Sequence, residues 1–336
     1  MKVVVTGATG NLGSACLRAL GADGQHEVVG VARRGPRVPQ GTEATAVTWH
    51  PADVSADDLD AVVAGADAVV HLAWKFQPTH RPDETWETNV VGTRRLLEAV
   101  RRQGVPAFVT ASSVAAYSPV DHDEPMDEGW TTDGASVAAY CREKAYNERI
   151  LDAFEASTSG TSGTRVVRLR PAFVFQRSAA SEQRRIFGGA LLRPKMLDRR
   201  FLPVLPVPAG LRMQAVHAGD VAQAVVAAVE RPVTGAFNLA ADDVLRRREL
   251  GEVVGARTVE VPAGLVHGVV EAGWWTRVVP VPGSLLSALL SVPLLRTDRA
   301  RDELGWIPRH SAAAAVSELL EGAAMEAGSG MPPLHP

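Results

Sequence analysis

The sequence is poor in cysteine and has no excess of positive charge. Cys16 and Cys141 are its only cysteines, and neither lies among residues with metal-ligand spacing, which argues against a disulfide framework and a zinc site. The formal net charge is -3, whereas a surface that binds nucleic-acid phosphates normally needs a basic excess. We therefore expect no metal and no nucleic-acid partner, and we expect a small molecule as ligand.

The sequence also lacks a recognisable signal peptide and an unbroken apolar span. A core strand is expected from Lys2, which leaves no room for a charged and then apolar leader. Residues 278–295 carry no charge, but Pro280, Pro282 and Pro293 would interrupt a membrane helix. We interpret this segment as a buried or substrate-facing part of a second lobe and expect a cytoplasmic protein. A membrane-surface role is the alternative, although the polar face that such helices need is missing.

Strand-like and helix-like segments alternate through the first half of the chain. Apolar runs such as residues 68–70 are typical of strands buried on both faces. This order predicts an α/β fold of the Rossmann type, a doubly wound parallel sheet with a smaller C-terminal lobe. The expected strands are Lys2–Thr6, Glu27–Ala32, 46–49, 68–72, Ala107–Ala111 and 165–170, with helices beginning near Asn11, Ser55, Asp83 and Val137.

A glycine-rich turn follows the first expected strand directly. Gly7, Gly10 and Gly13 permit a sharp turn, close approach of the backbone to a pyrophosphate and tight helix packing, while the new helix presents free N–H groups. The alternative is an ordinary glycine-rich turn. We predict a dinucleotide site here, formed by Gly7, Thr9, Gly10, Asn11, Leu12 and Gly13.

The regular alternation ends near Pro171, where prolines become frequent. Residues 155–164 are small and polar and predict a surface loop. We expect a dinucleotide-binding domain at 1–172, to which 213–240 return through 214–217 and 236–239, and a substrate-binding lobe at 173–212 and 241–330.

Tyr140 and Lys144 form a second pattern, on a predicted helix where positions i and i+4 share one face. A phenol loses its proton only near pH 10, so proton transfer near neutrality needs a nearby positive charge. Lys144 and the oxidised nicotinamide can supply that charge and lower the pKa of Tyr140. The alternative is a surface tyrosine beside a solvated lysine.

Several further blocks stand in order along the chain. They are His71–Ala73, Asn89–Thr93, Ser112–Tyr117, Arg170–Phe175 and Val216–Ala222. With the glycine spacing and the Tyr-Lys pair, the chain over roughly residues 1–240 resembles the extended short-chain dehydrogenase/reductase group, also called the NAD-dependent epimerase/dehydratase family.

The resemblance implies roles for particular residues. Ser113 would hydrogen-bond the reacting oxygen beside Tyr140 and Lys144, completing the catalytic set. His217 is expected to be a structural hydrogen-bonding residue. The cofactor-lining residues implied beyond the glycine loop are Asp53, Val54, Leu72, Ala73, Trp74, Asn89, Ala111, Ser112, Pro171, Ala172, Phe173 and Val174.

The end of the second expected strand bears on the choice between NAD and NADP. An acidic residue here would hold the ribose hydroxyls of NAD, whereas an arginine accommodates the phosphate of NADP. Ala32 takes the acidic position and Arg33 and Arg34 follow, which favours NADP. The alternative is that both arginines only solvate the loop.

The resemblance leads us to expect particular residues for particular reactions, and some of these residues are missing from the sequence. Dehydratases of this family place Asp-Glu where Val114 and Ala115 stand, so dehydration is disfavoured. Apolar residues in the second lobe suit a partly apolar substrate. We therefore favour an NADP(H)-dependent ketone reductase or alcohol dehydrogenase. The candidate substrate-contacting residues are Lys75, Ser113, Val114, Tyr140, Arg184 and Arg212.

Two other functions remain open at this point. A nucleotide-sugar epimerase would use a retained NAD(P), and Arg184, Arg185, Arg199 and Arg200 could bind its phosphates. A non-catalytic dinucleotide-sensing protein is the alternative of another class. We also expect a homodimer that packs through helices near 83–102 and 137–154.

Overall fold

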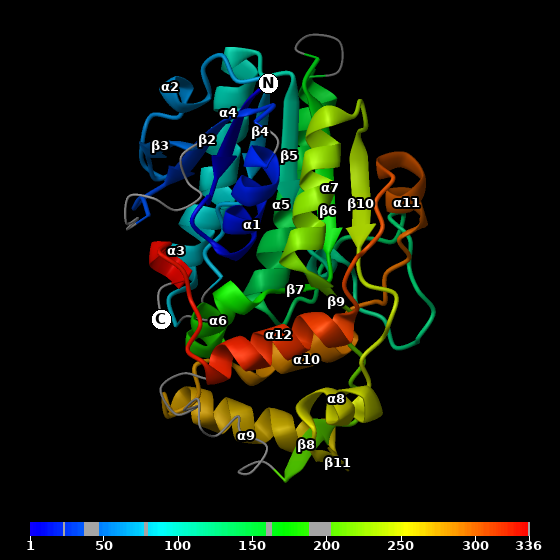
Figure 1. Ribbon diagram of the computed structural model, residues 1–336. Coiled ribbons are helices and arrows are strands. Elements are labelled where there is room, and N and C mark those ends of the chain that lie inside the picture. Colours follow the sequence, from blue (N-terminus) through cyan, green and yellow to red (C-terminus); the bar gives the residue numbers. More distant parts are fainter. Residues whose placement is uncertain (23, 37–46, 77–79, 159–162, 188–202, 335–336) are drawn as a thin grey trace.

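A computed structural model describes residues 1–336 except 23, 37–46, 77–79, 159–162, 188–202 and 335–336 (Figure 1). Its main sheet has seven parallel strands in the order β10-β6-β5-β4-β1-β2-β3. The strands are β1 (Lys2–Thr6), β2 (Glu27–Ala32), β3 (Val47–Pro51), β4 (Ala68–His71), β5 (Ala107–Ala111), β6 (Arg165–Pro171) and β10 (Gly235–Leu239). This confirms the predicted Rossmann-type fold class.

Helices cover both faces of the sheet because the central strands are apolar on both sides. Val3, Val4 and Val5 of β1 are fully buried, and they point alternately into two separate cores. One core lies under α1 (Asn11–Gly21), α7 (Ala218–Glu230) and α11 (Asp298–Leu304). The other lies under α2 (Asp60–Val63), α4 (Gly92–Gln103) and α5 (Ala139–Thr158) (Figure 1).

The chain that leads into helix α4 is not a regular α-helix. The predicted helix near Asp83 begins as α3 (Pro82–Trp86) and continues through a π-helical turn at Glu87–Val91 into α4. Helix α5 runs on to Thr158, so the first residues of the predicted loop 155–164 are helical, and 159–162 lie outside the described residues. The helix predicted from Ser55 begins later, at Asp60.

One predicted strand lies outside the main sheet. Residues 236–239 return to it within β10, as predicted, but β9 (Ala215–His217) pairs with β7 (Phe173–Phe175) in a separate two-stranded sheet. The prediction for 214–217 was therefore wrong. Beyond Pro171 the chain leaves the main sheet at the carboxyl end of β6, and β7 then forms a short parallel pair with β9.

The second lobe lies beyond the carboxyl ends of the main strands (Figure 1). Pro282 precedes α10 and Pro293 follows it, so these prolines bound a nine-residue helix. No helix among the described residues is long and apolar enough to span a membrane. The elements of this region are α6 (Ala180–Phe187), β8 (Val204–Pro208), α8 (Arg247–Val254), β11 (Arg257–Val261), α9 (Ala263–Trp275), α10 (Gly283–Ser291) and α12 (Ala312–Ala324).

Candidate active site

The turn from β1 to α1 requires its glycines. Gly7 has a positive φ of 68°, and a Cβ there would lie 2.5 Å from the backbone nitrogen of Ala73. A Cβ at Gly13 would lie 2.2 Å from the carbonyl oxygen of Gly7. A Cβ at Gly10 would meet nothing closer than 3.4 Å. Gly7 and Gly13 therefore permit close packing of the turn against the chain after β4 and against α1, while Gly10 lines the cavity in front of the turn.

The amino end of α1 is suited to an anion. Gly10 caps the helix without a side-chain hydrogen bond, and no acidic residue lies in the first turn. The first N–H groups of a helix have no intrahelical partner and carry a partial positive charge. Together with the cavity that Gly10 lines, these groups fit a dinucleotide pyrophosphate.

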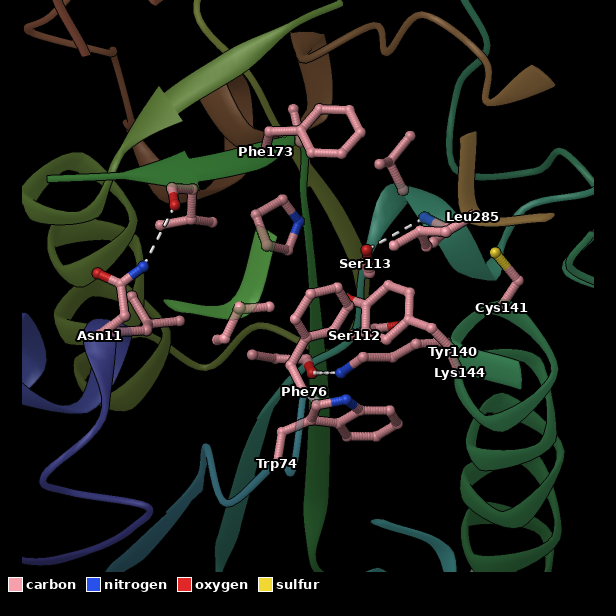
Figure 2. Close-up of a pocket in the computed structure, with 18 of the residues that line it drawn as sticks. Asn11, Trp74, Phe76, Ser112, Ser113, Tyr140, Cys141, Lys144, Phe173 and Leu285 are labelled. Atoms are coloured by element: carbon pink, nitrogen blue, oxygen red, sulfur yellow. Dashed lines mark hydrogen bonds between the residues drawn. The ribbon is translucent and has the colours of Figure 1, made fainter. Parts of the chain in front are cut away.

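Ser113, Tyr140 and Lys144 converge where β5 ends beside α5, and all three line one cavity (Figure 2). Ser113 follows β5 and caps a 3-10 helix at Val114–Ala116, accepting a hydrogen bond from the Ala115 N–H at 3.1 Å. Tyr140 and Lys144 stand one turn apart on α5. The predicted catalytic side chains are thus brought together.

Lys144 is enclosed by two groups. Its Nζ donates to the carbonyl oxygen of Ala111 at 2.8 Å and lies 3.4 Å from the centroid of the Trp74 ring, a cation–π distance. The lysine is only 4% exposed, and this burial lowers its pKa to about 7, against the opposing charges of Glu148 and Glu143. Its charge therefore changes near neutral pH.

The pKa of Tyr140 shifts in the direction opposite to the prediction. Burial raises it above the ordinary value, and an interaction with the Ser113 hydroxyl opposes the rise without cancelling it. The rings of Trp74 and Phe76 contact Tyr140 edge-on, with centroids 5.8 and 4.6 Å from its ring (Figure 2). The expected lowering by Lys144 does not outweigh this apolar packing, so the phenol is protonated at neutral pH.

A buried carboxylate that sequence reasoning missed supports the site from behind. Glu148 is fully buried and accepts a hydrogen bond from the Ser112 hydroxyl at 2.6 Å. It also accepts two hydrogen bonds from Arg170, both at 2.9 Å, and one from Arg168 at 3.0 Å. Although burial opposes it, the hydrogen bonds from Arg170 and Ser112 hold the pKa of Glu148 at about 2. Its i+4 spacing from Lys144 was the available signal. Glu148 ties the end of β5 to α5 and β6.

Tyr117 and His71, from two of the predicted blocks, have structural contacts. The Tyr117 hydroxyl receives a hydrogen bond from Arg170 at 2.9 Å and donates to Asn238 at 2.7 Å. His71 bridges Thr6 and Thr93, and burial lowers its pKa to about 3, which keeps the ring neutral. These contacts join strands and helices around the site.

A cavity of about 500 Å³ runs from the glycine turn past Tyr140 to the second lobe. Residues of α6, α9 and α10 line its far part, including Ile186, Val270, Leu285 and Leu289, so the α10 part of the predicted segment 278–295 faces this cavity. The predicted site residues that line it are Gly7, Gly10, Asn11, Leu12, Gly13, Leu72, Ala73, Trp74, Ala111, Ser112, Ser113, Val114, Tyr140, Lys144, Pro171, Ala172, Phe173 and Val174.

Other predicted residues lie outside this cavity. Asn89 is fully buried and binds the loop after β4, accepting from the Lys75 N–H at 2.7 Å and donating to Glu143 at 2.7 Å. Lys75 pairs with Glu84 at 2.9 Å. Arg212 is buried against Asp123 at 3.0 Å, and Arg184 lies 3.6 Å from Glu326. The cavity lining does not include Thr9, Arg33, Arg34, Asp53, Val54, Lys75, Asn89, Arg184 or Arg212, and Arg199 and Arg200 lie outside the described residues.

The end of β2 carries two exposed arginines. Arg33 Nε lies 3.9 Å from a carboxylate oxygen of Asp53, and Arg33 remains mostly exposed. Asp53 in turn accepts hydrogen bonds from the backbone and hydroxyl of Ser55, at 2.9 and 2.6 Å. Arg33 and Asp53 therefore border one surface, next to the strand end at which an adenosine ribose is bound in this type of fold.

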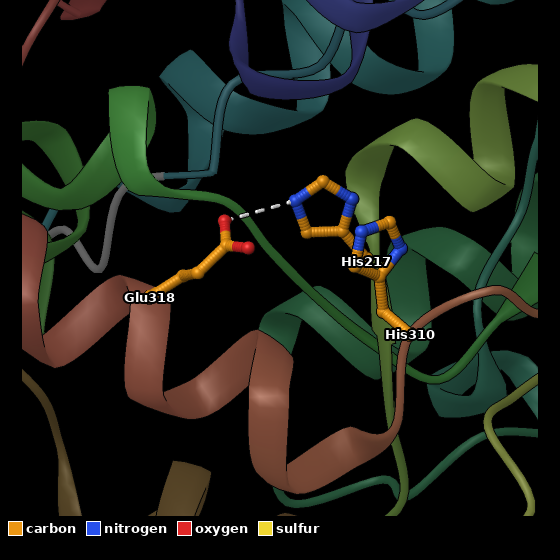
Figure 3. A group of neighbouring side chains, drawn as sticks. All are labelled: His217, His310 and Glu318. Carbon is orange, nitrogen blue, oxygen red and sulfur yellow. Dashed lines mark ion pairs between the residues drawn. The ribbon is translucent and has the colours of Figure 1, made fainter.

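His217, His310 and Glu318 form a separate cluster, with ligand-type atoms within 4.8 Å of one another (Figure 3). His217 Nδ1 accepts the Gly219 N–H at 3.1 Å, and its Nε2 lies 3.2 Å from Glu318. His310 Nδ1 lies 3.1 Å from buried Asp220. Both nitrogens of His217 are engaged, so metal coordination would break the cap of α7. The structure places His217 in a structural role.

Comparison with known proteins gives one family over most of the chain. The sequence profile of the NAD dependent epimerase/dehydratase family matches residues 3–240. A 3-diazoavenalumate denitrifying reductase of a Streptomyces species is 28% identical, with 92% of this chain and 97% of that protein aligned. A UDP-glucose 4-epimerase of Corynebacterium glutamicum is 25% identical over 93% of this chain and 92% of that protein.

Other similarities are shorter or concern the fold alone. A putative dihydroflavonol 4-reductase of Synechocystis is 27% identical over 50% of this chain, which spans 47% of the length of that relative. A solved UDP-glucose 4-epimerase of Stenotrophomonas, with bound NAD and formylated UDP-arabinopyranose, superposes with a TM-score of 0.72 at 21% identity, covering 97% of this chain and 98% of that chain.

Proposed function

The chain belongs to the NAD-dependent epimerase/dehydratase family of extended short-chain dehydrogenase/reductase enzymes, and on that basis we propose that it is an NADP(H)-dependent ketone reductase or alcohol dehydrogenase acting on a partly apolar small molecule. The observation that carries this proposal is the lining of the cavity. Lys144 is the one lysine or arginine among the described lining residues, and the walls beyond Tyr140 are mostly aliphatic and aromatic, with Glu182 and Gln183 of α6 as polar exceptions. A diphosphate would find no other cationic partner among them.

The catalytic residues suit carbonyl reduction. When bound, the nicotinamide supplies the hydride. Tyr140, protonated at neutral pH, can donate its proton to the carbonyl oxygen, and Ser113 can donate a hydrogen bond to the same oxygen. Lys144 lies one turn from Tyr140, where its Nζ can hold a ribose hydroxyl and its charge can favour the phenolate left behind. The rings of Phe76 and Trp74 pack edge-on against the Tyr140 ring and fix its orientation.

Arg33 and Arg34 favour NADP over NAD. Both are exposed at the end of β2, and the preceding position, Ala32, offers no carboxylate to a ribose. Asp53 Oδ2 lies 3.9 Å from Arg33 Nε, while both hydrogen bonds from Ser55 go to the other oxygen, Oδ1. The Arg33 side chain is 61% exposed, so this single long contact leaves most of the guanidinium available to a phosphate. Membership of the family indicates a nicotinamide dinucleotide as cofactor, and the preference for NADP is our proposal.

The direct test is turnover with NADPH and NADH against a panel of aryl and alkyl ketones and UDP-sugars. We expect NADPH-dependent ketone reduction that is lost in Tyr140→Phe. Cofactor retained through purification, with interconversion of UDP-glucose and UDP-galactose and no net oxidation, would instead support the epimerase alternative, which the full-length similarity to a UDP-glucose 4-epimerase keeps open. Full ketone reduction by Tyr140→Phe would refute the assigned mechanism.

The surface of α5 also supports the predicted homodimer. Trp86, at the end of α3, and Tyr146, on α5, are both exposed and lie with ring centroids 4.9 Å apart. Exposed aromatic pairs are typical of protein interfaces. We propose that this face, near the predicted helices 83–102 and 137–154, packs against its copy in a second chain.

A further inference from the structure

Helix α6 places an unpaired carboxyl group in the apolar cavity. Glu182 lines the cavity and, among the described residues, forms no hydrogen bond or ion pair, apart from a longer-range interaction with Arg185. A carboxyl group in apolar surroundings normally has a partner, because its desolvation is costly. The reduction chemistry assigned to Ser113, Tyr140 and Lys144 does not use Glu182.

The position of Glu182 relates it to the substrate end of the cavity. Ile186 stands one turn further along α6 and lines the same cavity. Phe187 follows, with its ring centroid 5.6 Å from that of Phe76, which in turn lies 4.6 Å from Tyr140. The carboxyl end of α6 is therefore linked to the catalytic phenol through the rings of Phe187 and Phe76, while Glu182 and Ile186, one turn apart, line the cavity beside it.

A second unpaired acceptor lies beside it. Gln183 also lines the cavity, and its Nε2 donates to the carbonyl oxygen of Val174 at 3.0 Å. Its Oε1 is buried and has no hydrogen-bond partner in the part of the chain that the structure describes. Neighbouring residues of α6 thus bring two unsatisfied acceptors to one wall, and a ligand that supplies a hydrogen-bond donor would satisfy them at little cost.

The electrostatics of this wall select against anions. Burial raises the pKa of Glu182 to about 7, with Arg185 opposing the rise, so the group is ionised above neutral pH. A donor such as a hydroxyl or ammonium group stabilises the carboxylate, whereas a second anion in the same apolar space repels it.

We propose that Glu182 determines substrate specificity: it accepts a hydrogen bond from a hydroxyl or ammonium group on an otherwise apolar ketone and disfavours ketones that carry an anionic group. That the substrate is a ketone rests on the proposed reductase function. The site itself, an acceptor for a donor group at the end of an apolar chain, stands on the cavity alone.

The test compares three 2-alkanone series of six to ten carbons, which end in methyl, hydroxyl or carboxylate, with NADPH at pH 8. In the natural protein we expect kcat/KM for the best hydroxyl ketone to exceed that of the matched carboxylate ketone at least tenfold. Glu182→Gln keeps an acceptor and removes the charge, so the carboxylate ketone should improve at least tenfold. Glu182→Leu should lose the preference for hydroxyl over methyl. Glu252→Gln on α8, an exposed site, is the matched control and should change neither ratio.

A binding measurement separates this inference from the proposed function. In the NADPH-loaded protein, octylammonium should raise the Tm and octanoate should not, and Glu182→Leu should abolish the difference. If no ketone is reduced but this difference appears, the reductase proposal fails and the donor site stands. If ketones are reduced with equal ratios in the natural protein and both variants, the donor site is refuted. A change in the Kd for NADPH with unchanged ketone ratios would assign Glu182 to the cofactor and also refute it.

Discussion

Replacing Glu148 with glutamine should destabilise the protein strongly, because two buried arginines depend on this carboxylate. Glu148 is fully buried, and Arg168 and Arg170 reach it with side chains that are 7% and 6% exposed. Removing one partner of a buried ion pair leaves an uncompensated charge, which typically costs about 3–5 kcal/mol. Arg168 also pairs with Asp152 and Glu155, so we expect a loss near the lower end, about 3 kcal/mol.

The pH dependence of stability gives an independent measure of the same interaction. The pKa of Glu148 falls from an ordinary value of 4.5 to about 2 in the folded protein. A group whose folded pKa is lowered contributes stability that is fully present above 4.5 and is lost as the pH falls towards 2. At about 1.4 kcal/mol per pKa unit, this contribution is about 3 kcal/mol, which agrees with the loss expected from the unpaired arginines.

The assay is urea unfolding followed by tryptophan fluorescence, at pH 7 and at steps down to pH 3. The free energy of unfolding of the natural protein should fall below pH 4.5. That of Glu148→Gln should already be lower at pH 7 and should decrease less steeply as the pH falls. Glu321→Gln is the matched control, because Glu321 forms an exposed pair with Arg177 and should cost less than about 0.5 kcal/mol. A Glu148→Gln variant within 1 kcal/mol of the natural protein at pH 7, on the scale of buried pairs, would refute this reasoning.

Further variants test the cofactor turn, the active-site charge, the cofactor preference and the dimer. Gly13→Ala should abolish NADPH binding, measured by fluorescence titration, because the new methyl group would lie 2.2 Å from the Gly7 carbonyl oxygen; unchanged affinity would contradict the packing. Since the pKa of Lys144 is lowered to about 7, its ammonium is lost as the pH rises through 7, so kcat/KM for reduction should fall above that pH, and Lys144→Met should lower the rate at pH 6 and flatten the profile. Arg33→Ala should raise the Kd for NADPH about tenfold with little change for NADH, by loss of one charge-assisted contact, and an unchanged ratio of the two affinities would remove Arg33 from the phosphate site. Trp86→Glu should convert a dimer to a monomer in light scattering, and a monomeric natural protein would contradict the proposed interface.

The sequence predicts best where local chemistry dictates the structure. Gly7 adopts a positive φ and lies against Ala73, so its glycine is needed for reasons that the strand-turn-helix pattern already suggests. The i+4 spacing of Tyr140 and Lys144 likewise fixes their shared face once the helix is recognised. The strand 215–217 could not be placed, because a three-residue segment pairs equally well with the main sheet or with β7, and only the tertiary path after Pro171 decides.

Burial is the property that spacing does not reveal, and it decides the electrostatics of this site. Glu148 and Glu182 are both glutamates on helices, and neither the i+4 spacing of Glu148 from Lys144 nor the context of Glu182 shows whether a cationic partner faces the carboxylate. Arginines from β6 meet Glu148 only because parallel strands bring Arg168 and Arg170 beside α5, and its pKa falls. Among the described residues Glu182 has only the longer-range interaction with Arg185, and burial raises its pKa. The carboxylate of Glu148 is therefore a permanent anion next to the catalytic residues, whereas the carboxyl group of Glu182, in the substrate part of the cavity, changes its charge near pH 7. On this reasoning, the first supports the strand end that carries Ser113, and the second remains available to recognise a ligand.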